Sequence, residues 1–156
     1  MSIFYFTMNI NGTTQSFIFR LFIISTAVNY VWEMAQMPLY QDMSFAALSS
    51  WLLCFRASLG DGLIIVTIWA LGAGLYKRVS WYRPLHLGPA LLLLASGALI
   101  AVAIELHALA AQRWAYSELM PIVPWLEIGL SPFVQLLLLP WCMMILADLR
   151  LLPSRQ

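Results

Sequence analysis

Charged residues are scarce in this chain. Only 10% of its 156 residues are charged, whereas 62% are hydrophobic, and the formal net charge is +1. A nearly neutral chain gives no reason to expect a nucleic acid or an acidic macromolecule as partner. Soluble proteins carry roughly 25% charged residues, and a water-soluble domain of this size could not hide so much apolar surface. The scarcity of charge therefore predicts that lipid, rather than water, surrounds much of the protein.

Cysteine and histidine are also scarce, with two of each. No Cys-x-x-Cys or His-x-x-x-His spacing indicates a metal site, and no glycine-rich phosphate loop follows a strand. We expect His86 and His107 on opposite faces of the membrane, where they cannot share a metal or a haem. Cys54 is expected near one surface and Cys142 far along another helix, which makes a disulfide implausible. We therefore expect no metal and no cofactor.

Long apolar runs are what the sequence does contain. Its mean hydropathy is +0.84, and a helix of about 20 apolar residues covers the hydrocarbon core of a bilayer. Four runs are long enough to span, at about residues 16–37, 51–76, 87–111 and 128–149. Pro140 is expected to bend the last of them because it removes a backbone donor. We predict an all-α integral membrane protein, a bundle of about four transmembrane helices that forms one domain over residues 1–156.

The first ten residues are apolar but too few to cross a membrane. They include Phe4, Tyr5 and Phe6, and aromatic residues are common anchors at the membrane interface. The N-terminus lacks the basic region and the small-residue cleavage site of a secretory signal. We therefore expect residues 1–10 to lie at the interface and the first long apolar run to be retained.

Basic residues predict the orientation. Six of the eight Lys and Arg residues are expected on one side of the membrane, namely Arg20, Lys77, Arg78, Arg83, Arg150 and Arg155. Short loops rich in Lys and Arg stay in the cytoplasm. Both termini are then cytoplasmic, which agrees with an even number of crossings.

Polar side chains inside the four predicted helices gather in the outer half of the membrane. They are Asn29 and Glu33 in the first helix, Arg56 and Asp61 in the second, Glu105 and His107 in the third, and Gln135 in the fourth. A charged side chain deep in the hydrocarbon costs roughly 2.5–3.5 kcal/mol, so such residues usually face one another or a wet cavity. We predict a pocket of carboxylates and arginine in the outer half of the bundle.

Helical spacing indicates which of these residues point into the bundle. Asn29, Glu33 and Gln36 share one face. Glu105 continues a row of small residues that begins at Gly97, and such rows pack against neighbouring helices. His107 is rotated by about 200° from Glu105, so it could equally lie in water at the helix end. Arg56 could equally form a structural ion pair with one of the acids.

Aromatic residues and prolines are concentrated in the two loops expected outside. A Met-Pro pair follows an aromatic, acid-bearing stretch twice, at residues 37–38 and 120–121. The first stretch contains Trp32, and the second contains Arg113, Trp114 and Tyr116. One interpretation is an aromatic belt at the level of the lipid head groups. The other is a rigid lid over a polar pocket.

Several segments resemble those of small bacterial polytopic membrane proteins. They are Asn29-x-x-Trp32-Glu33, Ala57-Ser58-Leu59-Gly60-Asp61, Arg113-Trp114-x-Tyr116-Ser117-Glu118-Leu119-Met120-Pro121 and Gly129-Leu130-Ser131-Pro132. This resemblance implies a multi-pass protein of the bacterial inner membrane and no particular activity. The Asn-x-x-Trp-Glu helix and the aromatic-x-Tyr stretch before a proline also resemble intramembrane carotenoid cyclases, hydratases and terpene cyclases. The chain lacks the full carboxylate motif of the lycopene cyclases.

Three functions remain open on these residues. The first is a binding protein for a membrane lipid or small hydrophobic molecule, or an accessory subunit that docks a membrane-protein partner or a second copy of itself. The second, implied by the cyclase resemblance, is a cofactor-independent isoprenoid enzyme: Glu33 or Glu105 would protonate an alkene, Trp32, Trp114 and Tyr116 would stabilise the cation, and Asp61 would take the final proton. The third is a proton-coupled transporter, for which four helices are few.

Overall fold

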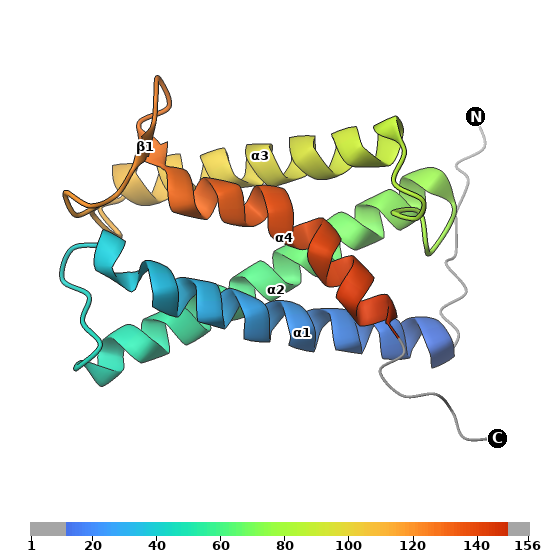
Figure 1. The fold of residues 1–156 in the computed structure, drawn as a ribbon, viewed down its shortest axis with the longest axis horizontal. Coiled ribbons are helices and arrows are strands. Elements are labelled where there is room, and N and C mark those ends of the chain that lie inside the picture. Colours follow the sequence, from blue (N-terminus) through green and yellow to red (C-terminus); the bar gives the residue numbers. More distant parts are fainter. Residues whose placement is uncertain (1–11, 150–156) are drawn as a thin grey trace.

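The computed structural model describes residues 12–149, which form four long helices and a small hairpin (Figure 1). The helices are α1 (Gly12–Gln36), α2 (Leu48–Tyr76), α3 (Leu87–Ala110) and α4 (Leu130–Asp148), with a 3₁₀ turn η1 (Met37–Leu39) after α1. Strands β1 (Ile122–Val123) and β2 (Ile128–Gly129) pair antiparallel before α4. The predicted all-α bundle is confirmed in its helices. The largest difference in bounds is the start of α1, which begins at Gly12 rather than near residue 16.

All four helices are long and apolar enough to cross a membrane. Arg20 lies inside α1. The predicted interfacial segment at residues 1–10, with Phe4, Tyr5 and Phe6, lies outside the described residues, as do Arg150 and Arg155. The orientation and the extent of the domain stay predictions.

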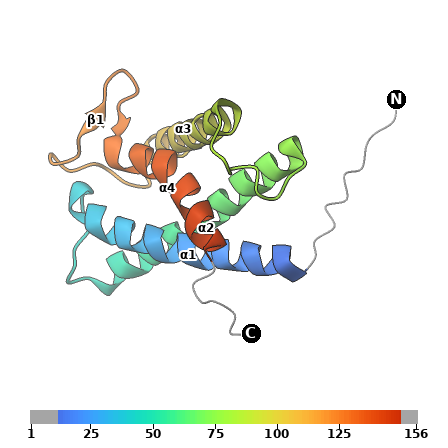
Figure 2. The same ribbon diagram turned by 45° about the vertical axis from the view of Figure 1, so that its right-hand side comes forward.

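The helices pack as two pairs. Packing is most extensive between α1 and α2, then between α3 and α4, and α4 also lies against α1, whereas α2 and α3 make few contacts. In Figure 1, α2 and α3 approach each other near the loop that joins them and diverge toward the opposite end of the bundle. Figure 2 shows α4 running from the side of α3 across to α1 and α2. α1 begins and α4 ends at the end where α2 and α3 approach each other.

One half of the bundle, the half near the α2–α3 loop, holds a solid apolar core. Buried aromatic residues of this core include Phe17, Trp69, Trp81 and Tyr82. The indole of Trp81 donates a hydrogen bond to the Trp69 carbonyl at 3.0 Å, and the Trp69 indole donates to the Val79 carbonyl at 3.0 Å. Both indole N–H groups are therefore satisfied away from water, as buried polar groups require.

Close contact between α3 and α4 depends on one glycine. A Cβ atom at Gly97 would collide with the backbone carbonyl of Leu136, so only glycine allows this approach. Pro140 lies inside α4, and α4 turns near its middle in Figure 1. A proline removes one helical hydrogen bond and displaces the preceding turn. Gly97 and Pro140 together set how α4 lies across the other helices.

The loops after α1 and α3 pair with each other at the other end of the bundle. Tyr40 and Tyr116 form an isolated antiparallel bridge. The backbone N–H of Gln41 donates to the Ala115 carbonyl at 2.9 Å, and that of Ser117 donates to the Leu39 carbonyl at 2.9 Å. We call residues 37–41 and 113–117 the paired loops. The predicted aromatic loops therefore form one connected layer.

Candidate functional site

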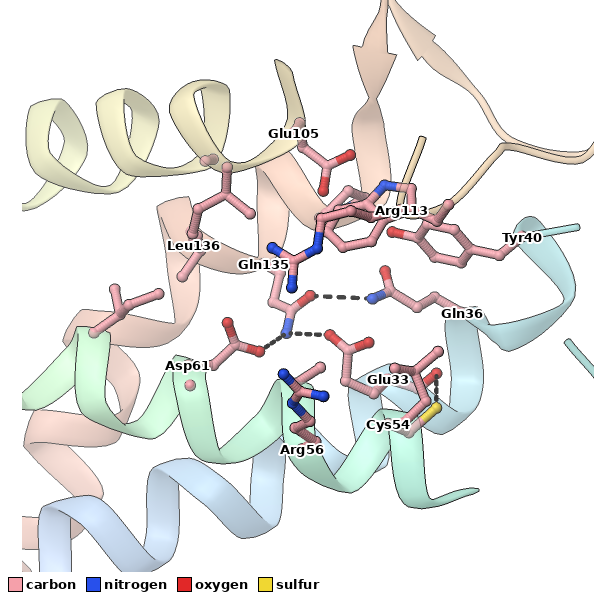
Figure 3. Close-up of a pocket in the computed structure, with 18 of the residues that line it drawn as sticks. Glu33, Gln36, Tyr40, Cys54, Arg56, Asp61, Glu105, Arg113, Gln135 and Leu136 are labelled. Atoms are coloured by element: carbon pink, nitrogen blue, oxygen red, sulfur yellow. Dashed lines mark hydrogen bonds between the residues drawn. The ribbon is translucent and has the colours of Figure 1, made fainter. Parts of the chain in front are cut away.

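A cavity of about 400 Å³ lies beneath the paired loops. Its polar and charged lining residues come from α1, α2, α3, α4 and the paired loops, and they are Glu33, Gln36, Tyr40, Arg56, Asp61, Glu105, Arg113 and Gln135. Figure 3 shows these side chains around the space between the helices. The volume falls within the range of about 300–1,000 Å³ that is typical of small-molecule sites.

Gln135 of α4 is the centre of the polar network. Its side chain is 2% exposed, and its amide nitrogen lies 3.1 Å from a Glu33 oxygen, 3.1 Å from an Asp61 oxygen and 2.8 Å from the Asn29 oxygen. The three acceptors come from α1 and α2. An amide NH₂ group has only two hydrogens, so one nitrogen cannot give each acceptor its own hydrogen. The network brings two carboxyl groups together and leaves them short of donors.

Gln36 extends this network toward the start of α4. Its amide donates to the Gln135 oxygen at 3.4 Å, and its oxygen accepts a hydrogen bond of 2.7 Å from the Ser131 hydroxyl. Asn29 is held in turn by a bond of 2.8 Å from its amide to the Ser25 carbonyl. These bonds fix the amides of α1 and α4 against each other.

Glu105 is positioned separately, by the loop that follows α3. Its side chain is 3% exposed and accepts a hydrogen bond from the Tyr116 hydroxyl. The same hydroxyl accepts a bond of 2.9 Å from the backbone N–H of Gly129, at the start of α4. Tyr116 therefore connects Glu105, the third carboxyl group of the cavity, to the backbone at the start of α4.

Arg56 and Arg113 line the cavity without pairing with these acids. Both side chains are exposed, and in Figure 3 their guanidinium groups extend into the cavity from opposite sides. Within residues 12–149 the single ion pair is Arg83–Asp148, at 3.2 Å in the other half of the molecule. The structural ion pair considered for Arg56 is therefore absent from the part of the chain that the structure describes.

Aromatic rings of the paired loops cover the cavity. Tyr40 and Trp114 both line it, and their ring centroids lie 6.3 Å apart in an edge-to-face arrangement. The Tyr40 and Tyr116 rings lie 5.8 Å apart. Burial, together with the nearby carboxylates, raises the pKa of Tyr40 above its usual value. Burial and the hydrogen bond to Glu105 likewise raise the pKa of Tyr116, so both phenols keep their protons at neutral pH.

The cavity opens on the side where α2 and α3 diverge. Arg56, Ala57 and Gly60 line it and are nevertheless exposed on the surface of α2. Leu53 of α2 also lines the cavity and is 52% exposed. An exposed leucine beside polar lining groups is compatible with contact to lipid.

The structure brings most of the predicted site residues together and leaves two apart. Glu33, Asp61, Glu105, Arg56, Arg113, Trp114 and Gln135 line the cavity. Asn29 and Tyr116 do not line it but hold residues that do, through the bonds described above. His107 is exposed and outside the cavity lining, and Trp32 packs against the apolar core.

Among the residues of the cavity that were absent from the site predicted from the sequence, two hold polar groups at its centre and beneath the paired loops, Gln36 and Tyr40. Gln36 lies one turn from Glu33 on the same helical face, which was a usable signal. Tyr40 follows the Met-Pro pair, and no feature of the sequence indicated that its loop would pair with residues 115–117. Within residues 12–149 no group of three His, Cys, Asp or Glu side chains is arranged to hold a metal ion. Cys54 and Cys142 are both free thiols.

No protein-family model, curated protein or solved structure matches this chain. The geometry of the cavity is therefore the basis for any statement about its function.

Proposed function

We propose that this chain is a multi-pass membrane protein whose cavity binds an amphiphilic molecule that enters sideways from the lipid, between α2 and α3. The observation that carries the proposal is the cavity itself. It combines a ligand-sized volume with polar groups from all four helices and an exposed apolar lining residue, Leu53. Burying so many charged groups in an apolar bundle is costly, and a bound polar head group would offset that cost.

The opposite half of the bundle favours binding over transport. Trp69, Trp81 and Tyr82 are at most 3% exposed and fill the region near the α2–α3 loop with an apolar core. A transported solute would need a polar path through that region, or a large rearrangement of close-packed side chains. The cavity fits a site that opens to one half of the membrane.

Two glycines of α2 provide a matched test of binding. A Cβ atom would have open space at both Gly60 and Gly74, with no atom within 4 Å, but only Gly60 lines the cavity. The experiment is mass spectrometry of lipids extracted from gently purified wild type, Gly60→Phe and Gly74→Phe, with empty membranes as reference. We expect wild type and Gly74→Phe to retain a defined lipid or hydrophobic molecule. We expect Gly60→Phe to bind that molecule at least about 10-fold more weakly, which corresponds to about 1.4 kcal/mol of binding free energy.

Two results would oppose binding. One is a purified wild-type protein that carries only bulk phospholipid in the proportions of the empty membrane. The other is equal retention of the defined molecule by Gly60→Phe and Gly74→Phe. Either result would favour the accessory-subunit alternative, and cross-linking in membranes would then be used to find the partner.

A second candidate, a proton-initiated isoprenoid cyclase or hydratase, is favoured by one specific arrangement. Glu105 accepts a hydrogen bond from Tyr116, and the rings of Tyr40, Tyr116 and Trp114 lie together at the same end of the cavity. A carboxylic acid beside aromatic faces can protonate an alkene and stabilise the resulting cation. A Glu33→Gln, Glu105→Gln double variant with unchanged activity in a complementation assay would eliminate this candidate.

A further inference from the structure

We propose that the cavity recognises a zwitterionic head group, one that carries an amine and a phosphate on a short linker, as in an aminophospholipid. This inference rests on the proposed function and specifies the ligand class of the same site. Its basis is that groups of both charges line one cavity and do not pair with each other.

The carboxyl side of the cavity calls for a cationic donor. Glu33 and Asp61 share one amide nitrogen of Gln135, which must also serve Asn29. A carboxylate removed from water is stabilised only when donors or a positive charge compensate it. An ammonium group supplies a positive charge and three hydrogens. It would meet the donor deficit that Gln135 leaves.

The paired loops add a second feature that suits an ammonium group. The rings of Tyr40 and Trp114 line the same cavity, in edge-to-face contact with each other at 6.3 Å. Aromatic faces attract cations, and cages of aromatic and acidic groups recognise ammonium ligands. Tyr40 and Trp114 therefore give an ammonium group a second class of partner in the same cavity as the carboxyl groups.

The arginines suit the anionic part of the same head group. Arg56 and Arg113 reach the cavity from α2 and from a paired loop, and neither guanidinium group has an ion-pair or hydrogen-bond partner within residues 12–149. Guanidinium groups bind phosphate with two parallel hydrogen bonds. Two unpaired guanidinium groups on opposite sides of one cavity (Figure 3) can hold one phosphate between them.

The order of the charges along α2 matches the order in an aminophospholipid. Asp61 lies five residues beyond Arg56, about 7.5 Å deeper along the helix axis and further from the paired loops. Arg56 is exposed at the opening, whereas Asp61 is partly buried. The phosphate would lie at the opening between the arginines, with the lipid tails outside between α2 and α3. The terminal amine would reach the carboxyl groups inside.

A head group with only one charge fits less well. A phosphate without an amine would approach Glu33, Asp61 and Glu105 with no positive group to offset the repulsion. An amine without a phosphate would leave Arg56 and Arg113 unpaired beside it. Only a zwitterion places each of its charges next to groups of opposite sign.

The test is native mass spectrometry of the full-length protein titrated with defined lipids. The probes are phosphatidylethanolamine and phosphatidylglycerol with identical tails, together with soluble phosphoethanolamine. We expect wild type to bind phosphatidylethanolamine at least about 10-fold more tightly than phosphatidylglycerol. Competition by soluble phosphoethanolamine would indicate that the head group alone is the ligand, whereas its failure to compete would indicate that the tails are needed; both support the zwitterion.

Two sets of variants separate the two charges. Glu33→Gln with Asp61→Asn should remove the preference for the amine, and Arg56→Gln with Arg113→Gln should weaken both phospholipids. Glu118→Gln and Arg78→Gln are matched controls, because both residues are exposed and outside the cavity, and they should behave as wild type. Size-exclusion chromatography and circular dichroism in detergent check that each variant is folded.

The possible failures can be told apart. Three results would overturn the zwitterion. They are equal binding of the two phospholipids by folded wild type, an unchanged preference in the folded Glu33→Gln, Asp61→Asn variant, and unchanged binding of both phospholipids by the folded Arg56→Gln, Arg113→Gln variant. Retention of an amine-free lipid by wild type but not by Gly60→Phe would also overturn it while leaving the proposed binding function standing. Absence of any defined lipid would overturn both.

Discussion

Gln135 has the largest structural role of any single polar side chain in the cavity. It is almost fully buried and, from α4, contacts polar groups of both α1 and α2. A leucine has a similar size but no donor or acceptor. Replacement of Gln135 by leucine would leave the buried polar groups that contact it without a hydrogen-bond partner. The loss of stability then depends on the desolvation of those groups.

Replacement of this residue gives the first prediction. Gln135→Leu should lower the free energy of unfolding in detergent by roughly 1–3 kcal/mol, because Glu33, Asp61 and Asn29 lose their shared donor. Gln15→Leu is the control, since Gln15 is exposed near the start of α1, and it should change stability by less than about 0.5 kcal/mol. Reversible chemical unfolding followed by circular dichroism measures both. Equal stability of the two variants would contradict a structural role for the network.

The two tyrosines of the paired loops give a prediction about pH. Burial raises the pKa of Tyr40 and Tyr116, so they stay neutral in the native protein when free tyrosine ionises, near pH 10. The stability that this neutral state contributes is fully present below about pH 10 and falls above it, because the unfolded chain then releases protons that the native protein keeps.

An alkaline absorbance titration in detergent tests this. At about pH 11, the double variant Tyr40→Phe, Tyr116→Phe should give the same phenolate signal as wild type in the native state. In denaturant it should give a smaller signal than wild type. A smaller native signal in the double variant than in wild type would show that Tyr40 and Tyr116 ionise in the native wild-type protein with the pKa of free tyrosine. That result would contradict their burial.

Among the helices, the contact between α3 and α4 is sensitive to a single methyl group. Gly97→Ala places a Cβ where the Leu136 carbonyl already lies, and overpacking of this kind costs about 1–3 kcal/mol. Gly74→Ala adds the same group where no atom lies within 4 Å, and there the gain over glycine in a helix is about 0.5–1 kcal/mol. Thermal unfolding in detergent should therefore shift in opposite directions for the two variants. A shift in the same direction would contradict the close approach at Gly97.

The four helices could be predicted from the sequence because length and hydropathy alone determine which segments suit a bilayer. Glu105 could also be placed inside the bundle, since it continues a row of small residues. The tertiary pairings could not be predicted in this way. The bridge between Tyr40 and Tyr116 and the contact of Gln36 with Ser131 join segments far apart in the chain, and helical periodicity gives the face of a helix but not its neighbour.

Over the whole molecule, the two ends of the bundle have different roles. The end near the α2–α3 loop is filled by aromatic and aliphatic side chains and fixes how the helices are held together. The other end is opened by the divergence of α2 and α3, and there the polar groups of four helices meet. A cavity placed away from the best-packed region can adapt without loss of the fold.

The orientation of these two ends is the last prediction. The distribution of basic residues predicts that the α2–α3 loop is cytoplasmic and that the paired loops are outside. In a Cys54→Ala, Cys142→Ala background, a membrane-impermeant maleimide should label Glu118→Cys in intact spheroplasts, and Leu85→Cys only after lysis. Both positions are exposed in loops at opposite ends of the bundle. The reverse pattern would put the cavity in the cytoplasmic half, and labelling of both in intact spheroplasts would contradict a spanning protein. The predicted pattern would expose the cavity to the outer leaflet, so candidate lipids should then be chosen from that leaflet.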